Sequence, residues 1–486
     1  MIPTLNAISL DLLTALPEIV VLVMAMFILL LDLFLKPGNR YLVYVLAQVT
    51  LLLAAILTFA THTPDIRYAF SGLFVDDALA DVLKLAIYLA TSVTLVYTRS
   101  YLSLRGMFSG EFYALVLFAT LGMMVMVSGQ HFLTLYMGLE LLSLCLYALV
   151  ALDRDNPRST EAAMKYFVLG ALASGMLLYG MSMLYGVTGS LNISGVAEAL
   201  MNGAPDHGVL VLGLVFIVAG LAFKLGAAPF QMWVPDVYHG SPTAITLFIG
   251  SATKLAAFAM VMRLLVQALF VLAVDWQGML MIMAVLSMII GNIAAIAQSN
   301  IKRMLAYSTI SHIGFLMLGL LSASLNGYAS ATFYMLSYVL MTLAGFGIIL
   351  LLTRQGFEAD RLEDLKGLNQ RSPWFAFLML IIMFSMAGIP PTLGFYAKFT
   401  VLQAALQAGF VVLVVFAVLM ALIGAFYYLR VVKYMYFDDA EDNSPISAPV
   451  DMKLLLSVNA IALLILGLLP EQFMEACGYA ILHSIQ

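Results

Sequence analysis

Two stretches decide the fold: FKLGAAPFQMWVPD (residues 223–236) and GIPPTLGFYAKF (residues 388–399). Each lies in a long apolar segment and places prolines next to a lysine, Lys224 or Lys398. Proline removes a backbone donor and clashes with the preceding turn, so a helix breaks there. Carbonyl groups freed by a break survive at membrane depth only against protein or water. We therefore expect two broken membrane helices, each with a polar cavity beside a lysine.

The composition of the whole chain indicates a membrane protein. Of 486 residues, 63% are hydrophobic and 10% are charged, against roughly 45–50% and 25% in soluble domains. These fractions exclude an ordinary water-soluble enzyme, and the net charge of -5 gives no basic surface for nucleic acid. Windows of about 19 residues predict an all-α, polytopic membrane protein of about 14 transmembrane helices. The predicted spans are 12–35, 41–61, 79–98, 112–129, 131–151, 163–186, 208–232, 242–270, 277–298, 303–321, 327–352, 373–406, 410–436 and 452–470.

The two stretches with prolines occupy spans 7 and 12, which are five spans apart. An odd shift reverses the direction of crossing, so matching features predict two inverted five-helix repeats, 112–270 (spans 4–8) and 277–436 (spans 9–13). Within the single membrane domain 1–486, three helices in 1–111 would precede the repeats. The segment 437–486 would hold the last helix and a C-terminal tail. Interrupted helices at corresponding places in inverted halves are typical of ion-translocation sites.

Basic residues in the connections and near the ends of the spans fall almost entirely on one side of the predicted bundle. The connections that follow odd-numbered spans hold sixteen Lys and Arg residues, and the opposite side holds only Arg67 and Arg263. Cytoplasmic loops concentrate Lys and Arg. Both termini and the loop 187–207 are therefore expected on the periplasmic side, and the loop 353–372 on the cytoplasmic side.

Four basic residues remain, and all lie inside spans: Lys84, Lys224, Lys254 and Lys398. A lysine at a helix centre costs about 2.5–3.5 kcal/mol to insert, so such a group indicates function by default. Glu140 lies about nine residues into span 5, roughly 13 Å deep at 1.5 Å per residue. A carboxylate and a lysine within about 4–6 Å hold each other charged. A changing distance between Glu140 and Lys224 could switch the lysine between holding and releasing a proton. The alternative is a static ion pair that only fixes packing.

Three further groups lie at depth. Lys254 lies about twelve residues into span 8 and could pass protons between the halves. His312 lies roughly 15 Å into span 10 and shares a helical face with Ser308. It could relay protons, since histidine changes charge near neutral pH, or be a neutral core residue. For Lys398 we expect water in the break and groups across the bundle as stabilisers, with desolvation favouring proton release.

Other polar residues receive structural interpretations. Lys84 is expected to pair with Asp81, its i, i+3 neighbour, and Glu18 lies nearer a span end, where an interfacial position is expected. The two cysteines, Cys145 and Cys477, are not expected to meet. The sequence has no phosphate-binding loop and no metal-ligand pattern, so we expect this chain to bind no cofactor and no metal.

Four stretches resemble one known family. They are MGLELLSLCLYALVAL (137–152), FKLGAAPFQMWVPDVYHGSPTAIT (223–246), SNIKRMLAYSTISHIGF (299–315) and MAGIPPTLGFYAKF (386–399). Together they are similar to the antiporter-like membrane subunits of respiratory complex I, the NADH:quinone oxidoreductase. The resemblance covers essentially the whole chain. The family shares its fold with subunits of cation/proton antiporters and of membrane-bound hydrogenases.

The resemblance implies a role for each matching residue. Glu140 and Lys224 would be the pair of the first half-channel, and Lys254 would connect the halves on a broken helix 8. Lys398 would lie on the exit side, on broken helix 12. His312 matches a histidine that is common in the family. Relatives often have histidine where this chain has Gln231.

The function implied by the resemblance is proton translocation in the membrane arm of the complex, in the bacterial inner membrane. NADH oxidation and quinone reduction in partner subunits would drive it, and those partners would bind NAD, quinone, FMN and the iron–sulfur clusters. Expected neighbours are other antiporter-like chains and small membrane-arm chains. The alternative is a subunit of a cation/proton antiporter or of a membrane-bound hydrogenase. A glutamate at position 398 would favour the antiporter, and Lys398 argues against it.

Overall fold

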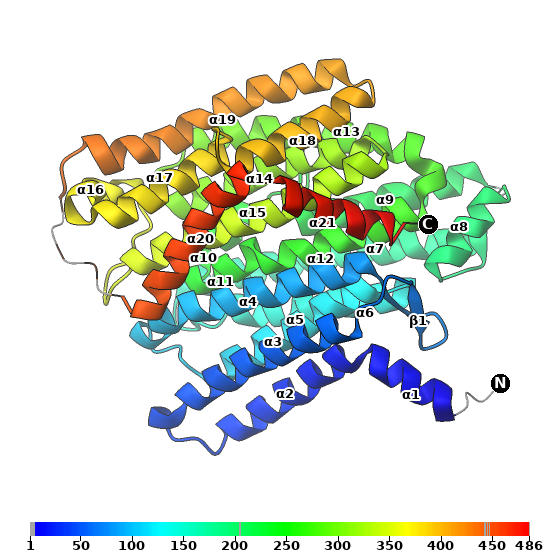
Figure 1. Ribbon diagram of the computed structural model, residues 1–486, viewed down its shortest axis with the longest axis horizontal. Helices are drawn as coiled ribbons and strands as arrows, with labels where there is room; N and C mark the ends of the chain where they lie inside the picture. The colour runs from blue at the N-terminus through cyan, green and yellow to red at the C-terminus, as the bar shows by residue number, and fades with distance from the viewer. Residues whose placement is uncertain (1–4, 204–205, 442–443, 445, 447, 486) are drawn as a thin grey trace.

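The structure is a computed structural model that describes residues 5–203, 206–441, 444, 446 and 448–485. Long helices run side by side through one bundle, as Figure 1 shows. The elements of the first part of the chain are α1 (Leu5–Thr14), α2 (Leu16–Asp32), η1 (Pro37–Asn39), α3 (Tyr41–Thr61), β1 (Arg67–Ala69), β2 (Phe74–Asp76), α4 (Ala78–Leu104), α5 (Gly110–Ser128), α6 (Phe132–Val150), α7 (Pro157–Thr188), α8 (Ile193–Met201), α9 (His207–Leu225), α10 (Trp233–Gly240), α11 (Thr243–Gly250), α12 (Ala252–Val261) and the π-helix η2 (Met262–Ala268). The elements that follow are η3 (Phe270–Leu272), α13 (Ala273–Ile296), α14 (Ile301–Leu321), α15 (Leu325–Leu352), η4 (Leu362–Leu365), α16 (Leu368–Arg371), α17 (Pro373–Ala387), α18 (Leu393–Gln407), α19 (Val411–Phe437), α20 (Val450–Leu468) and α21 (Glu471–Leu482).

The predicted all-α membrane fold is confirmed. Within the described residues, twelve helices are long and apolar enough to cross a membrane, and they coincide with twelve of the predicted spans. The predicted spans 12–35 and 373–406 are represented by shorter helices. Span 1 corresponds mainly to α2, and span 12 is divided into α17 and α18.

The three helices expected to be broken are all interrupted. Span 7 corresponds to α9, which ends at Leu225, and α10 begins just beyond the predicted span end; span 12 is divided into α17 and α18. Gly226 and Gly388 end α9 and α17 in the left-handed conformation, each with φ of +84°. Span 8 is interrupted between α11 and α12 at Ser251, whose φ of -114° and ψ of -92° leave the helical region.

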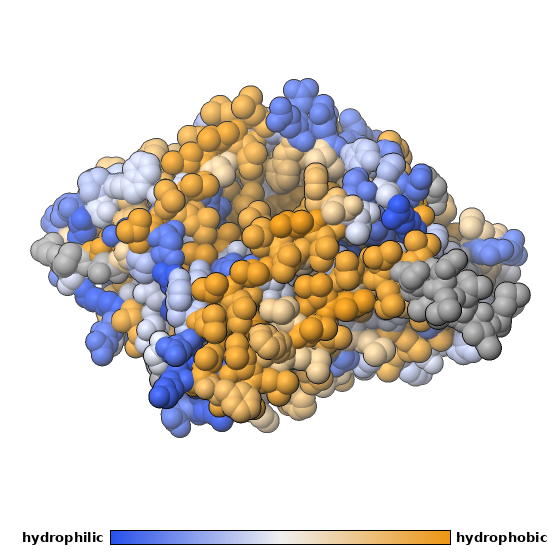
Figure 2. Space-filling model, turned by 60° about the horizontal axis from the view of Figure 1, so that its bottom comes forward, coloured by the Kyte–Doolittle hydropathy of each residue, from blue (hydrophilic) through white to orange (hydrophobic). Residues whose placement is uncertain are grey.

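The ends of the bundle are distinct. The described ends of the chain and α8 lie at one end of the helices, and α16 lies at the other (Figure 1). Figure 2 shows apolar side chains across the middle of one face, with polar side chains gathered toward its edges. An apolar belt between polar ends is what a bilayer requires of a membrane protein.

Glycines bring two helix pairs into close contact. A Cβ on Gly122 of α5 would lie 2.7 Å from the backbone nitrogen of Leu142 in α6. A Cβ on Gly291 of α13 would lie 2.6 Å from the backbone nitrogen of Ser311 in α14. Because side chains cannot fit there, each glycine lets two backbones touch, as small residues do in membrane helix pairs. These pairs are spans 4–5 and 9–10, the first two helices of each predicted repeat.

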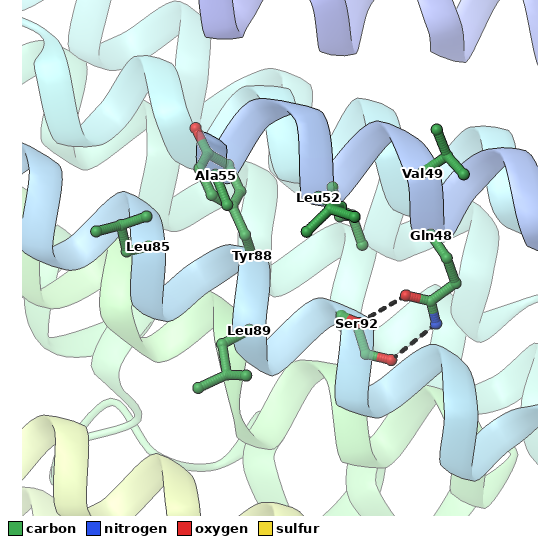
Figure 3. Close-up of a pocket in the computed structure, with 9 residues that line it drawn as sticks. Gln48, Val49, Leu52, Ala55, Leu85, Tyr88, Leu89 and Ser92 are labelled. Atoms are coloured by element: carbon green, nitrogen blue, oxygen red, sulfur yellow. Dashed lines mark hydrogen bonds between the residues drawn. The ribbon is translucent and has the colours of Figure 1, made fainter. Parts of the chain in front are cut away.

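The core lies where the two halves meet. Helices α11, α12, α14 and α15 are almost wholly buried, whereas only 28% of the residues in the apolar windows of α19 and α20 are buried. At the edge of the bundle, α3 and α4 form a groove of about 390 Å³ that Gln48 and Ser92 line. Figure 3 shows the two hydrogen bonds of this pair: Ser92 Oγ donates to Gln48 Oε1 at 2.6 Å, and Gln48 Nε2 donates to the carbonyl of Ser92 at 3.1 Å.

Some elements were not predicted. Strands β1 and β2 form an antiparallel hairpin in which Tyr68 pairs with Val75. The expected C-terminal tail contains α21, which packs against α15 and α4. Ser484, just beyond α21, accepts a hydrogen bond from the backbone N–H of Leu79 at 2.8 Å. Both elements are too short to register in hydropathy windows that are sized for a bilayer.

Candidate functional site

Lys224 lies in the last turn of α9, immediately before the break. Its Nζ donates a hydrogen bond to Oγ of Ser143 at 2.9 Å. Ser143 in turn donates to the carbonyl of Leu139, one turn earlier in α6. Lys224 is therefore fixed against α6, the helix that carries Glu140.

Glu140 and Lys224, whose changing distance the sequence suggested as a proton switch, form no direct ion pair among the described residues. Among the described residues no ion pair within 4.0 Å joins them, and Oε1 of Glu140 is buried without a hydrogen-bond partner. Ser143 lies three residues after Glu140, hence on the same face of α6 one turn along. The serine hydroxyl thus occupies the place at the lysine that a carboxylate was expected to take.

Lys254 binds the broken end of α9. Its Nζ donates to the carbonyls of Leu225 at 2.8 Å and Lys224 at 3.3 Å. The ammonium also lies 5.1 Å from the ring centroid of Trp233, the first residue of α10. The side chain is 1% exposed. The last carbonyls of a helix carry partial negative charge, so they stabilise this cation without a carboxylate.

Lys398 repeats this arrangement in the second half. Its Nζ donates to the carbonyls of Ala387 at 2.9 Å and Met386 at 3.0 Å, at the broken end of α17. Phe315 of α14 lies beneath it, with 5.0 Å from Nζ to the ring centroid. In both halves a buried lysine on a neighbouring segment thus caps the carbonyl end of a broken helix.

The two break glycines make room for these lysines. A Cβ on Gly226 would lie 3.5 Å from Nζ of Lys254, and one on Gly388 would lie 2.8 Å from Cδ of Lys398. Only glycine adopts their backbone conformation without strain. Gly226 and Gly388, which follow the ends of α9 and α17, are therefore part of the two lysine sites.

His312 is buried between two tyrosines. Its Nδ1 lies 2.7 Å from the hydroxyl of Tyr334 on α15, and its Nε2 lies 3.1 Å from the hydroxyl of Tyr428 on α19. The hydroxyl of Tyr428 also lies 2.5 Å from Oγ of Ser308. Ser308 and His312, which were predicted to share a helical face, therefore both contact the Tyr428 hydroxyl. Phe315, three residues after His312, is the ring under Lys398.

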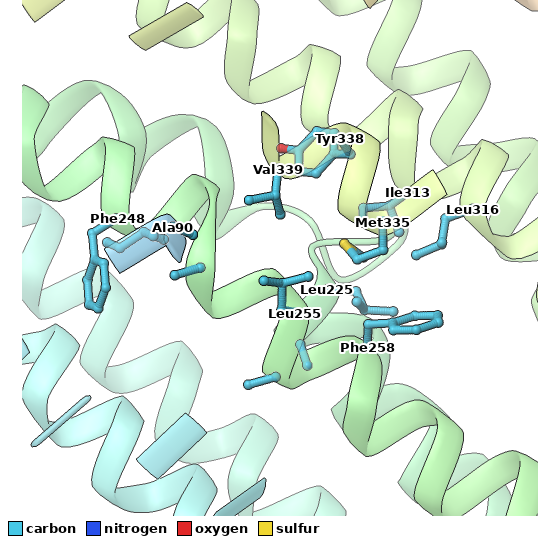
Figure 4. Packing of buried hydrophobic residues seen from close by; sticks show 14 of the residues in the cluster. Ala90, Leu225, Phe248, Leu255, Phe258, Ile313, Leu316, Met335, Tyr338 and Val339 are labelled. Carbon is cyan, nitrogen blue, oxygen red and sulfur yellow. The ribbon is translucent and has the colours of Figure 1, made fainter. Parts of the chain in front are cut away.

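Apolar side chains separate the two lysine sites. Figure 4 shows Leu225, Leu255 and Phe258 of the first half facing Ile313, Leu316 and Met335 of the second. All six are nearly inaccessible. The described side chains provide no hydrogen-bonded path from Lys254 to His312. The structure therefore brings Lys224, Ser143 and Lys254 together around one break, and Lys398 and His312 around the other.

Lys84 does not pair with Asp81, contrary to the prediction. Its Nζ lies 2.7 Å from Oε1 of Glu18, and Asp81 instead binds Nδ1 of His62 at 2.6 Å. Glu18 lies in the first turn of α2 and is 6% exposed, so it is buried within the protein. Lys84 reaches across to α2 because a tertiary partner outweighs a weak pair on one helix. Burial raises the pKa of the nearby Asp76 carboxyl, in β2, to about 7.

Arg263 is buried at the end of span 8 and is not exposed in a loop. Its guanidinium makes two hydrogen bonds to Asp77, from Nη1 at 2.6 Å and from Nη2 at 2.9 Å. Both side chains are 1% exposed. Asp77 also caps α4 by accepting from the backbone N–H of Ala80. This pair ties the N-terminal helices to the first repeat.

A polar cavity of about 220 Å³ opens near α10 and η4. Lys302 and Glu358 line it. Nζ of Lys302 donates to the carbonyl of Ser241 at 2.7 Å, and Glu358 accepts from the hydroxyls of Tyr101 and Thr243. These residues were not singled out from the sequence, because Lys302 and Glu358 lie at predicted span ends where charges are ordinary. Tyr334 and Tyr428 could have been noticed in the sequence only as tyrosine hydroxyl groups inside apolar spans, which is a weak indication of a site.

The polar groups near the two breaks are of few kinds. No group of three or more His, Cys, Asp or Glu residues among them is placed to hold a metal ion. Gln231 lies between the two halves of span 7, and its buried Oε1 has no partner in the described structure. The site is therefore an arrangement of lysines, hydroxyls, one carboxylate and one imidazole, which are groups that hold and transfer protons.

Comparison with known protein families gives one matching model. The family described as "NADH:quinone oxidoreductase/Mrp antiporter, TM" matches residues 129–424. Two full-length relatives carry the name NADH-quinone oxidoreductase subunit N. The protein from Methylovorus glucosotrophus is 74% identical over 99% of this chain and 100% of its own length. The protein from Nitrosomonas europaea is 58% identical over 98% of this chain and 99% of its own length.

Solved structures of similar fold come from several complexes. A chain of respiratory complex I from Thermus thermophilus matches with a TM-score of 0.82 at 33% identity, covering 96% of this chain and 100% of that one. A chain of the Mrp complex from Dietzia sp. matches with a TM-score of 0.82 at 20% identity, covering 97% of this chain and 96% of that one. The likeness to the Mrp chain is one of fold alone.

Proposed function

Since the chain belongs to the antiporter-like membrane subunits of NADH:quinone oxidoreductase, as a full-length relative of subunit N, we propose that it translocates protons. The proposed relay consists of Glu140, Lys224, Lys254 and Lys398, with His312 between the halves. One observation carries the proposal. Lys254 and Lys398 are buried, and each donates to the terminal carbonyls of a broken helix.

Carbonyl stabilisation makes these lysines suitable for proton transfer. An ammonium held by a buried carboxylate is locked into an ion pair, and breaking such a pair costs about 3–5 kcal/mol. Helix-end carbonyls stabilise a cation more weakly, by about 0.3–2 kcal/mol. A small shift of the break relative to Lys254 or Lys398 therefore changes how strongly the proton is held.

The first half takes up the proton in this proposal. Glu140 lies one turn before Ser143, whose hydroxyl binds Lys224, so we propose that a movement of the end of α9 along α6 exchanges serine for carboxylate. The Lys224 carbonyl is also a ligand of Lys254. Any displacement of the end of α9 therefore acts on both lysines together.

The second half passes the proton outward. His312 binds two hydroxyls, and tyrosine hydroxyls both donate and accept. A proton arriving at the imidazole can move along this chain of hydroxyl groups. Lys398, one helical turn away over Phe315, is the proposed exit group.

The redox chemistry is assigned to partner subunits. We infer that NAD, FMN, the iron–sulfur clusters and quinone bind there, and that the neighbours of this chain are antiporter-like and small membrane-arm subunits. We also infer an inner-membrane location with both termini periplasmic, from the distribution of Lys and Arg. The division into repeats at 112–270 and 277–436 belongs to the same proposal, and the matching glycine contacts of α5–α6 and α13–α14 support it. A role in a cation/proton antiporter or a hydrogenase rests only on shared fold.

The test replaces the first-half groups in the assembled enzyme. Lys224→Ala and Glu140→Ala are each expected to reduce proton pumping and the coupled quinone reductase activity by about tenfold or more, as loss of a proton-transfer group does. Pumping is measured with a pH-sensitive dye in membrane vesicles. The control is Lys366→Ala, which removes a lysine outside the spans. Glu441 lies 2.6 Å from its Nζ and raises the pKa of Lys366 by hydrogen bonding, so this lysine keeps its proton.

A purified complex that carries Lys224→Ala or Glu140→Ala and still pumps the wild-type number of protons per NADH would sink the proposal. Native gels establish that each variant assembles. If the Lys366→Ala control showed the same drop in activity, the cause would be defective assembly and not the loss of a proton-transfer group.

A further inference from the structure

An apolar groove of about 500 Å³ lies between α2, α5 and α6, away from both lysine sites. Leu29, Ala114, Leu115, Phe118 and Ala148 line its length. Its volume falls within the roughly 300–1,000 Å³ of small-molecule sites. Leu29 is 41% exposed, so the groove opens at the outer surface of the bundle, where lipid surrounds a membrane protein.

Two opposite charges line the same groove, Glu111 and Arg154. Glu111 lies in the first turn of α5, and Arg154 lies four residues after the last residue of α6, so both mark the same end of these helices. Neither side chain forms an ion pair or a hydrogen bond with any described residue. The neighbouring Asp32, by contrast, is already matched: it pairs with Arg40 at 3.5 Å and accepts from the backbone N–H of Gly110.

We propose that this groove binds one zwitterionic phospholipid that carries a primary amine, the phosphatidylethanolamine class. The phosphate lies at Arg154, the ammonium at Glu111, and an acyl chain along the apolar lining. Charged groups at the helix ends and apolar groups toward the bilayer centre match the orientation of a lipid in its leaflet. The guanidinium is the side chain best suited to a phosphate.

Other lipids match these charges less well. An anionic phospholipid without an amine satisfies Arg154 but places negative charge against Glu111. A choline headgroup carries the positive charge, yet its trimethylammonium has no N–H to donate to the Glu111 carboxylate. A headgroup with a phosphate and a primary amine satisfies both residues, since the phosphate accepts from Arg154 and the ammonium donates to Glu111, and charge-assisted hydrogen bonds are the stronger kind.

The test measures lipid binding to the full-length chain by native mass spectrometry from mild detergent. The probes are palmitoyl-oleoyl phosphatidylethanolamine, phosphatidylcholine and phosphatidylglycerol. We expect about two- to fivefold tighter binding of phosphatidylethanolamine, the range given by one exposed ion pair. Glu111→Gln is expected to abolish this preference while binding persists, a result that misfolding does not produce.

Two further variants and a control complete the set. Arg154→Gln and Ala148→Trp are expected to weaken binding of all three lipids, by loss of the phosphate contact and by filling the groove. Lys453→Gln, which removes a basic residue outside the groove, should leave binding unchanged. Equal affinity for the three lipids, or unchanged selectivity in Glu111→Gln, overturns the proposal.

The assembled complex provides an independent measurement. A photoreactive benzophenone side chain at position 148 is expected to cross-link to phospholipid. Cross-linking mainly to another protein chain would assign the groove to a subunit contact and overturn the lipid assignment. Neither result depends on whether the lysine relay moves protons.

Discussion

The two lysines at the helix breaks are held by backbone carbonyls. Lys254 and Lys398 have no carboxylate within ion-pair distance in the part of the chain that the structure describes. Lys84, by contrast, is paired with Glu18 at 2.7 Å. These three buried lysines thus fall into two kinds. Those at the breaks can lose a proton without leaving an unpaired carboxylate behind, whereas Lys84 is suited to holding helices together.

The substitution Lys398→Arg separates a titrating group from a fixed cation. Arginine keeps the charge but stays protonated at any physiological pH. We expect the variant to assemble and to pump about tenfold or more slowly, as when a proton-transfer group is lost. Native gels measure assembly, and a pH-sensitive dye in vesicles measures pumping.

The matched control is Lys453→Arg, at the start of α20 and away from both breaks. It should pump as the wild type does. Full pumping by Lys398→Arg would show that position 398 needs only a positive charge.

For individual side chains, the sequence located charged groups well and their partners poorly. Depth within a span identified Glu140, Lys224, Lys254 and Lys398 as unusual, because burying a charge is costly wherever it occurs. The partners come from other helices or from backbone carbonyls, and spacing along one helix does not predict them. The expected pairing of Lys84 with Asp81 was wrong for this reason.

Helix breaks and close helix contacts set the geometry of both halves. Gly226 and Gly388 end α9 and α17 and leave space for the lysines. Gly122 and Gly291 bring α5 to α6 and α13 to α14. The glycine contacts therefore position two helices that carry residues of the proposed relay, since α6 carries Glu140 and α14 carries His312.

Gly122→Ala tests whether the approach of α5 to α6 matters for stability. The added Cβ would lie 2.7 Å from a backbone atom, which cannot move aside as a flexible side chain could. We expect a loss of about 1–3 kcal/mol, typical of overpacking. Thermal unfolding of the purified chain in detergent measures the change.

Gly175→Ala is the control for this experiment. Gly175 lies in α7, with nothing within 4 Å of the new Cβ. Because alanine favours helix over glycine by about 1 kcal/mol, this variant should be unchanged or slightly more stable. Equal destabilisation of the two variants would contradict the close contact at Gly122.

Among the helices, the spans and the breaks at 7 and 12 could be predicted from hydropathy and from proline and glycine. The interruption of span 8 could not, because Ser251 and its neighbours give no proline signal; the family resemblance supplied it. The hairpin of β1 and β2 and the helix α21 were missed because they are shorter than a membrane span.

The bundle as a unit has two distinct ends. Both described ends of the chain and α8 lie at one end, and η4 and α16 belong to the segment at the other (Figure 1). This arrangement is what the alternation of fourteen spans requires. The distribution of Lys and Arg supplies the direction, and it predicts that the end with η4 and α16 faces the cytoplasm.

Cysteine labelling in intact cells tests the orientation. The two native cysteines, Cys145 and Cys477, are buried and free, and both are replaced by serine. A membrane-impermeant maleimide should label Asn202→Cys, at the end of α8, from outside. Lys366→Cys should react only after the membrane is opened. Rapid labelling of Lys366→Cys in sealed cells would reverse the predicted orientation.

The side-by-side packing of α12, α14, α15 and α18 has an electrical consequence. Lys254, His312 and Lys398 lie in the interiors of their spans, so in the relay proposed above passage between them runs along the plane of the bilayer. The membrane voltage acts along the bilayer normal, and a charge that crosses all of it requires about 2.3 kcal/mol of work per 100 mV. A lateral step crosses almost none of that potential. The voltage therefore opposes uptake at one face and release at the other, and leaves transfer between the two halves nearly free of electrical work.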